Sequence, residues 1–170
     1  MIELKEAVIA LGSNLGDREA NIKKAVRAMC NIPWLKFERV SSVYETVPLD
    51  TPDNQENYYN CCAVVQTELE PEALLGVCFG IEATLGRVRT HKNASRVVDL
   101  DLLLYEGKTV NKEILQLPHP KIAERAFVLL PLKELYPKKL PLFFKFAMQE
   151  AKVDYGGILS KKDINLLVDT

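Results

Sequence analysis

The chain has 170 residues, of which 48% are hydrophobic and 26% charged, a balance typical of a soluble protein that folds around a single core. Its 22 basic and 23 acidic residues leave a formal net charge of −1, so no overall field attracts nucleic acid or an anionic membrane. We therefore expect neither as a partner, and an anionic ligand must be held by a local basic cluster.

The start of the chain and its cysteines indicate a cytoplasmic protein. Residues 1–6 are charged and lack the apolar stretch of a secretory signal, and no window approaches the roughly 18 apolar residues of a membrane span. Cys30, Cys61, Cys62 and Cys78 have no zinc-binding spacing, so we interpret them as reduced core thiols. Adjacent residues of a strand point to opposite faces, which disfavours a Cys61–Cys62 disulfide.

The N-terminal elements begin with the apolar run Ala7–Leu11, which predicts a buried strand ending in the turn Gly12–Asn14. This turn is a weak match to a phosphate-binding loop, and we interpret it as structural. Apolar residues at helical spacing predict a helix over Arg18–Cys30, with Asp17 as its cap. Phe37–Thr46 has the alternating, β-branched pattern of a second strand.

The middle of the chain repeats this order. Val47–Asn57 is rich in Pro, Asp and Asn and predicts a long loop, followed by a third strand over Tyr58–Gln66. Pro71 starts a second helix, which runs to about Leu85 and stops at Gly86.

A basic loop, Arg87–Ser95, precedes an apolar strand at Val97–Tyr105. Glu106–Lys108 predicts a tight turn into a short strand near Thr109–Val110. Ala126–Leu135 then predicts a further helix.

The order β-α-β-β-α-β predicts an α+β, ferredoxin-like core, in which helices cover one face of an antiparallel sheet. In addition to this core we expect a β-hairpin. We also expect extra C-terminal helices or irregular packing elements, over Pro141–Met148 and Ile158–Val168. Residues 1–170 are expected to form one domain, although the tail after about Pro137 has no assigned role.

Asp99 and Asp101 form the sharpest local feature, because strand alternation places both carboxylates on one face of Val97–Tyr105. Two like charges in an apolar strand are costly unless a cation neutralises them, and Mg²⁺ prefers such a sparse carboxylate pair. A solvated strand face is the alternative. Arg87, Arg89 and Arg96 lie just upstream, and metal with arginine is typical of polyphosphate chemistry.

Single polar and aromatic residues are more ambiguous. His119, in a proline-flanked loop, suits a structural role or donation to a phosphate. Tyr58 and Phe127 suit either the core or stacking on a planar heterocycle, with Asn60 on the strand face of Tyr58.

The segment of residues 92–103, KNASRVVDLDLL, resembles the signature of the 6-hydroxymethyl-7,8-dihydropterin pyrophosphokinase family of folate biosynthesis. Residues 10–16 (ALGSNLG), 41–46 (SSVYET), 58–60 (YYN), 118–120 (PHP) and 125–132 (RAFVLLPL) resemble further family segments in the same order.

This resemblance implies an ATP-dependent diphosphokinase that transfers pyrophosphate to the hydroxymethyl group of the pterin, giving AMP and the pterin diphosphate. It implies two Mg²⁺ ions on Asp99 and Asp101, with Arg87 and Arg96 also catalytic. The implied nucleotide-side residues are Glu82, Arg87, Arg89, Arg96, Leu102, His119 and Arg125. The implied pterin-side residues are Thr46, Leu49, Tyr58, Asn60 and Phe127.

The chain departs from the family pattern at Phe79, Asn93 and Pro120. We expect a monomer, and association with neighbouring folate-pathway enzymes is left open. Two other hypotheses are a ferredoxin-like module that binds a metabolite without reacting, and a generic magnesium-dependent nucleotidyltransferase or phosphohydrolase.

Overall fold

The fold is an α+β arrangement of one large antiparallel sheet with helices on both faces. The computed structural model describes residues 3–49, 51, 53–88, 94–144, 146 and 155–167. In chain order the elements are β1 (Lys5–Ser13), α1 (Arg18–Cys30), β2 (Leu35–Val40), β3 (Val43–Thr46), β4 (Tyr58–Thr67), α2 (Pro71–Thr84), β5 (Asp99–Tyr105), β6 (Val110–Asn111), β7 (Gln116–Leu117), the 3₁₀ turn η1 (Ile122–Glu124), α3 (Ala126–Leu135), the 3₁₀ turn η2 (Leu142–Phe144) and β8 (Ile158–Lys162).

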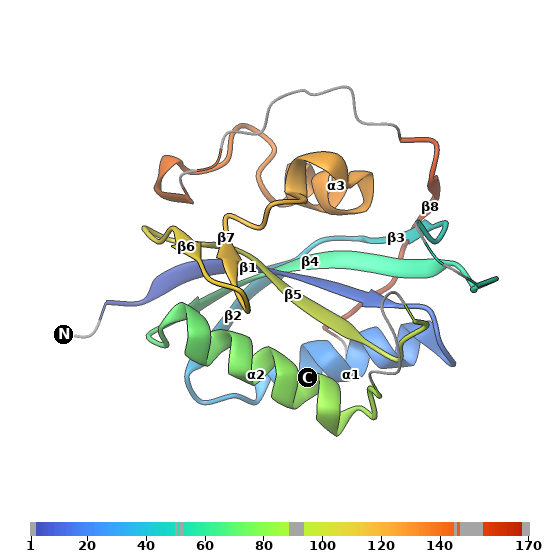
Figure 1. Ribbon diagram of the computed structural model, residues 1–170, viewed down its shortest axis with the longest axis horizontal. Helices are drawn as coiled ribbons and strands as arrows, with labels where there is room; N and C mark the ends of the chain where they lie inside the picture. The colour runs from blue at the N-terminus through green and yellow to red at the C-terminus, as the bar shows by residue number, and fades with distance from the viewer. Residues whose placement is uncertain are drawn as a thin grey trace.

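The strands of the main sheet follow the order β5-β1-β4-β3-β8, and β2 also pairs with β4 (Figure 1). Every pairing in this sheet is antiparallel. The predicted single strand Phe37–Thr46 is wrong, because β2 and β3 are separated at Ser41–Ser42. There the Ser41 hydroxyl accepts a hydrogen bond from Cys62 N at 3.0 Å, so a side chain replaces a backbone partner and the strand is interrupted.

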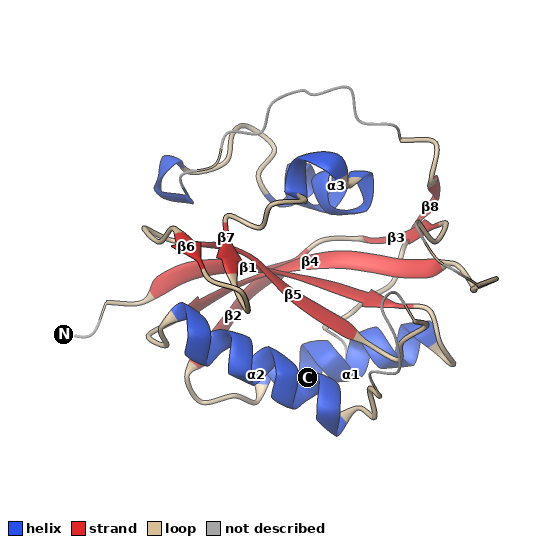
Figure 2. Cartoon of the chain, viewed as in Figure 1, coloured by secondary structure: helices blue, strands red, loops and turns tan. Residues whose placement is uncertain are grey.

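Side-chain alternation divides the sheet into two apolar layers. On β1, Ala7, Ile9 and Leu11 pack with α1 and α2, whereas Val8 packs with α3. The two helix layers therefore lie on opposite faces of the sheet (Figure 2). The expectation of helices on one face holds for α1 and α2, and α3 adds the second layer.

Local signals predicted several elements well. Helix α1 has the expected bounds, and Asp17 Oδ1 accepts a hydrogen bond from Ala20 N at 3.0 Å as its cap. Gly86 and Gly107 have φ of +87° and +72°, so both turns use a backbone conformation that glycine adopts easily. Cys61 and Cys62 are buried free thiols in opposite layers, as predicted.

The C-terminal expectation is only partly right. Helix α3 confirms Ala126–Leu135. The short strand expected near Thr109–Val110 corresponds to β6, which forms a hairpin with β7 at Gln116–Leu117, a strand that the sequence did not predict. The described part of Pro141–Met148 holds only η2, and Ile158–Val168 contains strand β8 instead of a helix. The open edge of β3 provides backbone partners that no local pattern reveals. The remaining residues of both segments lie outside the described ones. None of the helices in the described part of the chain could cross a bilayer.

Candidate active site

Strand β5 positions the two aspartates as the alternation predicted. Leu100 and Leu102 enter the layer shared with α1 and α2, so Asp99 and Asp101 face the α3 side. The pair lies at the outer edge of the sheet, because β5 is the end strand. The two carboxylates are thus held on the end strand of the sheet.

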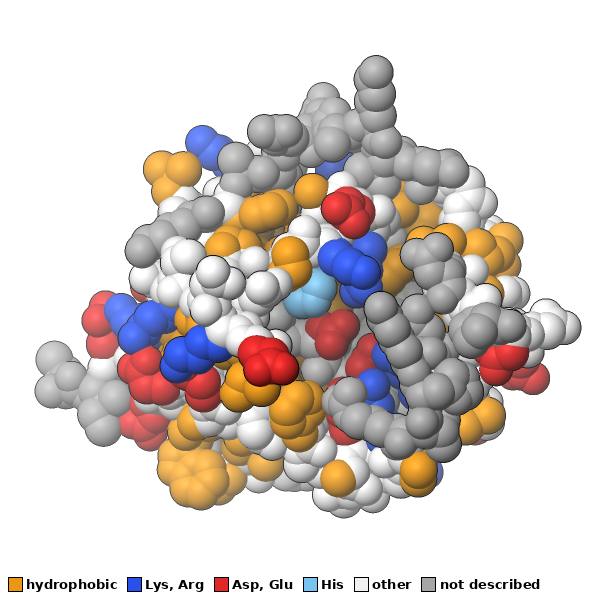
Figure 3. All heavy atoms as spheres, in the orientation of Figure 1, with side chains coloured by type: hydrophobic (Ala, Val, Ile, Leu, Met, Phe, Trp, Pro, Cys, Tyr) orange, Lys and Arg blue, Asp and Glu red, His pale blue; other side chains and the backbone are white. Residues whose placement is uncertain are grey.

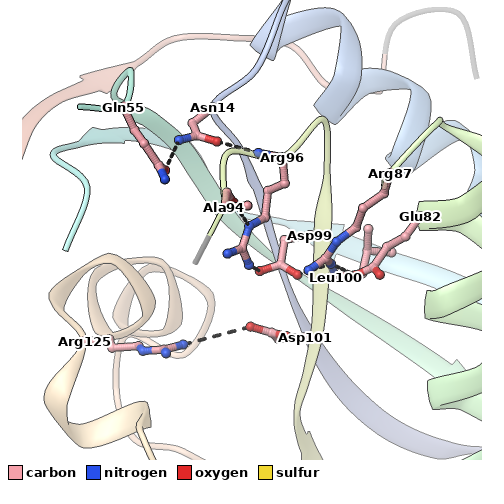
Figure 4. Close-up of polar contacts among 10 residues, drawn as sticks. All are labelled: Asn14, Gln55, Glu82, Arg87, Ala94, Arg96, Asp99, Leu100, Asp101 and Arg125. Carbon is pink, nitrogen blue, oxygen red and sulfur yellow. Dashed lines mark hydrogen bonds and ion pairs between the residues drawn. The ribbon is translucent and has the colours of Figure 1, made fainter. Parts of the chain in front are cut away.

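Asp99 is bound by two arginines that arrive from opposite sides (Figure 4). Arg87 donates to Asp99 and to Glu82, and Arg96 Nη1 donates to Asp99 Oδ2 at 2.7 Å. Glu82 is only 3% exposed and also accepts the backbone N–H of Leu100 at 2.8 Å. Glu82 therefore orients the Arg87 side chain and connects α2 to β5.

Asp101 has a different environment. Among the described residues, Arg125 forms an ion pair with it, with a guanidinium nitrogen 4.0 Å from Asp101 Oδ2 (Figure 4). Burial raises the pKa of Asp101, and the negative charge of Asp99 is the next cause. In the described ranges no group of three or more His, Cys, Asp or Glu side chains could bind a metal ion. A cation here would hence need ligands from a substrate or water.

A cavity of about 720 Å³ lies over these residues, between β5, α3 and the hairpin. Its lining includes Thr46, Leu49, Tyr58, Asn60, Arg87, Arg96, Asp99, Asp101, Leu102, His119, Arg125 and Phe127. In Figure 3 basic, acidic and histidine side chains gather in the hollow. The tertiary structure thus brings together residues from four separate parts of the sequence.

His119 is held in a neutral state. Its Nδ1 accepts a hydrogen bond from Lys121 N at 3.2 Å, which places the ring proton on Nε2. Burial, together with the charges of Arg125 and Lys121, lowers the pKa of His119 to about 4. At neutral pH the ring can therefore donate one hydrogen bond without carrying a charge.

The aromatic side of the cavity is built around Asn60. Asn60 Nδ2 donates to Thr46 Oγ1 at 2.8 Å, and a Cβ added to Gly12 would meet Asn60 Oδ1 at 2.8 Å. Gly12 is thus required for this position of the amide. Tyr58, on the same strand face, lies near Arg96, while Phe127 lies under Arg125 with the guanidinium 5.5 Å from the ring centroid. Each of the two aromatic rings therefore lies next to an arginine that also contacts Asp99 or Asp101.

Asn14 supports the site without lining the cavity, and the sequence interpretation missed it because its turn was taken as structural only. It is 1% exposed, and its Oδ1 accepts the backbone N–H of Arg96 at 2.9 Å. Its Nδ2 donates to Gln55 Oε1 at 3.0 Å (Figure 4) and to the carbonyl of Glu56 at 3.2 Å. One amide therefore joins the loop before β4 to the segment that carries Arg96.

Other predicted residues are placed differently. Glu82 supports Arg87 but does not line the cavity, and the Leu102 side chain belongs to the core. Arg89, with Asn93 of the basic loop, lies outside the described residues. Phe79 and Pro120, the other two departures, do line the cavity.

The lining also includes residues that sequence reasoning did not single out: Glu113, Ile114, Leu115, Gln116, Lys121 and Glu124. They lie in or after the short hairpin, where no motif marks them. The signal available was only their proximity in sequence to His119.

Comparison with known proteins gives a consistent result. Residues 8–137 match the sequence profile of 7,8-dihydro-6-hydroxymethylpterin-pyrophosphokinase. A 2-amino-4-hydroxy-6-hydroxymethyldihydropteridine pyrophosphokinase of Methylorubrum extorquens is 43% identical over 155 residues, which cover 91% of this chain and 98% of the relative. The protein of the same name from Bacillus subtilis is 41% identical over 129 residues, covering 76% of this chain and 77% of the relative.

Among solved structures, HPPK-DHPS of Plasmodium falciparum aligns with a TM-score of 0.63 at 16% identity. The alignment covers 86% of this chain and 44% of the other. At this identity the likeness concerns the fold alone.

Proposed function

The chain belongs to the 7,8-dihydro-6-hydroxymethylpterin-pyrophosphokinase family, and from this premise we propose how its own residues carry out the family's reaction. The reaction transfers pyrophosphate from ATP to the hydroxymethyl group of dihydropterin in folate biosynthesis. The pterin hydroxyl oxygen bonds to the β-phosphorus of ATP and its proton is released to solvent, while the bond from that phosphorus to the α-phosphate oxygen breaks and AMP leaves. No covalent enzyme intermediate is needed.

Arg87, Arg96 and Arg125 form the triphosphate side of the site. Guanidinium groups bind phosphate oxygens through paired hydrogen bonds and stabilise charge that develops as AMP departs. Support comes from their convergence on Asp99 and Asp101, where two of them are already desolvated against carboxylates. His119, neutral with its proton on Nε2, adds a donor for a phosphate oxygen. Arg89 completes the set on the resemblance alone.

Asp99 and Asp101 would hold Mg²⁺. The donor set fits, because both groups are carboxylates on one strand face and both line the cavity. Two protein ligands leave coordination positions for phosphates and water, which is typical of magnesium sites and accommodates two ions. When bound, Mg²⁺ neutralises phosphate charge and orients the triphosphate.

Tyr58 and Phe127 would stack on the two faces of the pterin. Asn60, with the backbone near Thr46 and Leu49, would bond its polar edge, because the amide is already oriented by Thr46 and given space by Gly12. The observation that carries the proposal is the proximity of each ring to an arginine of the triphosphate side. A pterin between the rings would present its hydroxymethyl group to the phosphates directly.

We propose three further features of the whole chain. The order β5-β1-β4-β3 supports a ferredoxin-like core. Burial of Phe144 in the α3 layer and of Leu166 in the opposite layer supports one domain over 1–170. A folic acid synthesis protein of Pneumocystis carinii, 41% identical over 134 residues that make up 18% of its length, supports work beside a neighbouring folate-pathway enzyme.

The test is AMP formation from ATP, Mg²⁺ and 6-hydroxymethyl-7,8-dihydropterin. We expect Asp101→Ala to lose activity by about a thousandfold or more, as removal of a charge-stabilising group at a reacting centre does. Glu68→Ala, which removes an exposed carboxylate in the turn after β4, is the matched control and should keep full activity. Full activity in Asp101→Ala would contradict the proposed roles.

A further inference from the structure

Strand β8 lies beyond residues 8–137, the part that matches the family profile, and it contacts the start of the loop after β3. It pairs antiparallel with β3, with Thr46 opposite Ile158. One residue further on, Val47 N donates to the Gly157 carbonyl at 2.9 Å. A Cβ added to Gly157 would lie 3.3 Å from Val47 Cγ2, so the approach of the two backbones is close.

The same strand reaches the end of that loop through a chain of charges. Lys162 Nζ lies 2.9 Å from Glu45 Oε2, and Arg18 Nη1 lies 2.9 Å from Glu45 Oε1. Arg18 Nη1 also donates to the carbonyl of Asn57 at 2.8 Å. The hydrogen bond from Lys162 is the first cause of a lowered pKa of Glu45, with that from Arg18 adding to it.

The two ends of the loop that β8 holds, at Val47 and at Asn57, lie next to residues that we assign to pterin binding. Thr46, fixed by β8, orients Asn60 through the 2.8 Å hydrogen bond between their side chains. Asn57, held by Arg18, is followed directly by Tyr58. Leu49 and Thr51, from the loop between these points, line the cavity. A shift of either end of the loop would therefore move a pterin contact.

The ends of the tail are well anchored. Phe144, before β8, is fully buried in the α3 layer, and Leu166, after it, is 3% exposed in the layer of α1 and α2. Strand β8 itself lies at the edge of the sheet, next to β3 (Figure 1).

We infer that β8 is a positioning element of the pterin pocket, which holds both ends of the loop over residues 47–57 through Gly157 and Lys162. The inference rests on the proposed function, because it takes the pterin side to be the cavity around Tyr58 and Asn60. It gives the C-terminal tail a role in substrate affinity in addition to stability. Among the described residues the hydrogen bonds and ion pairs of β8 reach β3 and α3 and not the triphosphate side, which should therefore keep its affinity.

The test uses the full chain with two variants of β8 and its flank. Lys162→Met removes the ammonium group and keeps the length of the side chain. Gly157→Val places a branched side chain against Val47. Lys161→Met is the matched control, since Lys161 is the neighbouring lysine of the same strand but lies 3.7 Å from Glu134 on α3. Asn60→Ala is the reference for the pterin site itself.

For each variant, the dissociation constant of hydroxymethyldihydropterin is measured with a non-hydrolysable ATP analogue present, and that of the analogue is measured alone. We expect pterin binding to weaken about threefold in Lys162→Met, the scale of a partly exposed ion pair. In Gly157→Val we expect about tenfold, the scale of a steric insertion. The pterin KM should rise in parallel, while kcat at saturation, analogue affinity and both constants of Lys161→Met stay within about twofold.

Two results would overturn the inference. One is unchanged pterin affinity in Lys162→Met while Asn60→Ala weakens it. The other is an equal loss of pterin and analogue affinity that follows the loss of unfolding free energy, since this is a purely structural effect. Unchanged pterin affinity in Asn60→Ala would instead show that the pterin site is elsewhere, and the proposed function of this cavity would fail first. If Gly157→Val reduces the yield of folded protein, Lys162→Met alone decides.

Discussion

The amide of Asn14 joins the loop before β4 to the Arg96 segment, and its replacement by alanine tests whether that link serves the reaction. The variant removes hydrogen bonds to Arg96 N, Gln55 Oε1 and Glu56 O, at 2.9, 3.0 and 3.2 Å. At about 1 kcal/mol each in net terms, the loss of unfolding free energy should be about 3 kcal/mol. The loss of unfolding free energy alone does not show whether the Asn14 hydrogen bonds serve the reaction or only stabilise the turn.

Asn21→Ala provides the matched control for that distinction. Asn21 supports the same turn, donating to Ser13 Oγ at 3.2 Å and to the Leu15 carbonyl at 2.8 Å. Its loss should cost about 2 kcal/mol of unfolding free energy. It contacts neither Arg96 nor the loop before β4 in any of these hydrogen bonds, so kcat/KM should fall by less than about threefold.

For Asn14→Ala we expect kcat/KM to fall by at least tenfold, equivalent to about 1.4 kcal/mol of transition-state stabilisation. Asn14→Asp keeps the acceptor for Arg96 N but loses the donor to the loop, so its kcat/KM should be intermediate. AMP formation and urea-induced unfolding at 25 °C measure the two quantities. Equal losses of kcat/KM in the Asn14 and Asn21 alanine variants, or none in either, would refute the reasoning.

Three further predictions follow from single contacts. Gly12→Ala should raise the pterin KM at least fivefold with ATP affinity retained, because its Cβ would meet Asn60 Oδ1 at 2.8 Å; an unchanged KM would contradict this. Asp101→Asn should stabilise the metal-free protein at pH 8, since it removes a like charge beside Asp99, and should abolish stabilisation by Mg²⁺; thermal unfolding with and without Mg²⁺ measures both. Burial lowers the pKa of His119 from 6.5 to about 4, so the unfolded chain takes up its proton first and the unfolding free energy falls as pH decreases through this window. His119→Gln should reduce that slope, and identical urea titrations of both proteins between pH 7 and 4 would count against it.

The helix Arg18–Cys30 and the facing of Asp99 and Asp101 were predictable from the sequence. Both depend on regular side-chain periodicity, and the helix depends also on its capping aspartate. These signals act within a few residues of each other. The same alternation places Cys61 and Cys62 in opposite apolar layers. The resemblance added the aromatic and basic residues that the cavity brings together.

The sequence alone did not determine β8, the break at Ser41–Ser42 or the role of Asn14. Strand β8 forms because the edge of β3, more than a hundred residues earlier, offers backbone partners, and Lys162 pairs opposite Val43. The break depends on Cys62 N meeting the Ser41 hydroxyl, and Asn14 acquires its role from Gln55 and Arg96. Periodicity and capping are local and can be read along the chain. Hydrogen bonds between distant segments depend on how the sheet and its loops are assembled, and so only the tertiary structure decides them.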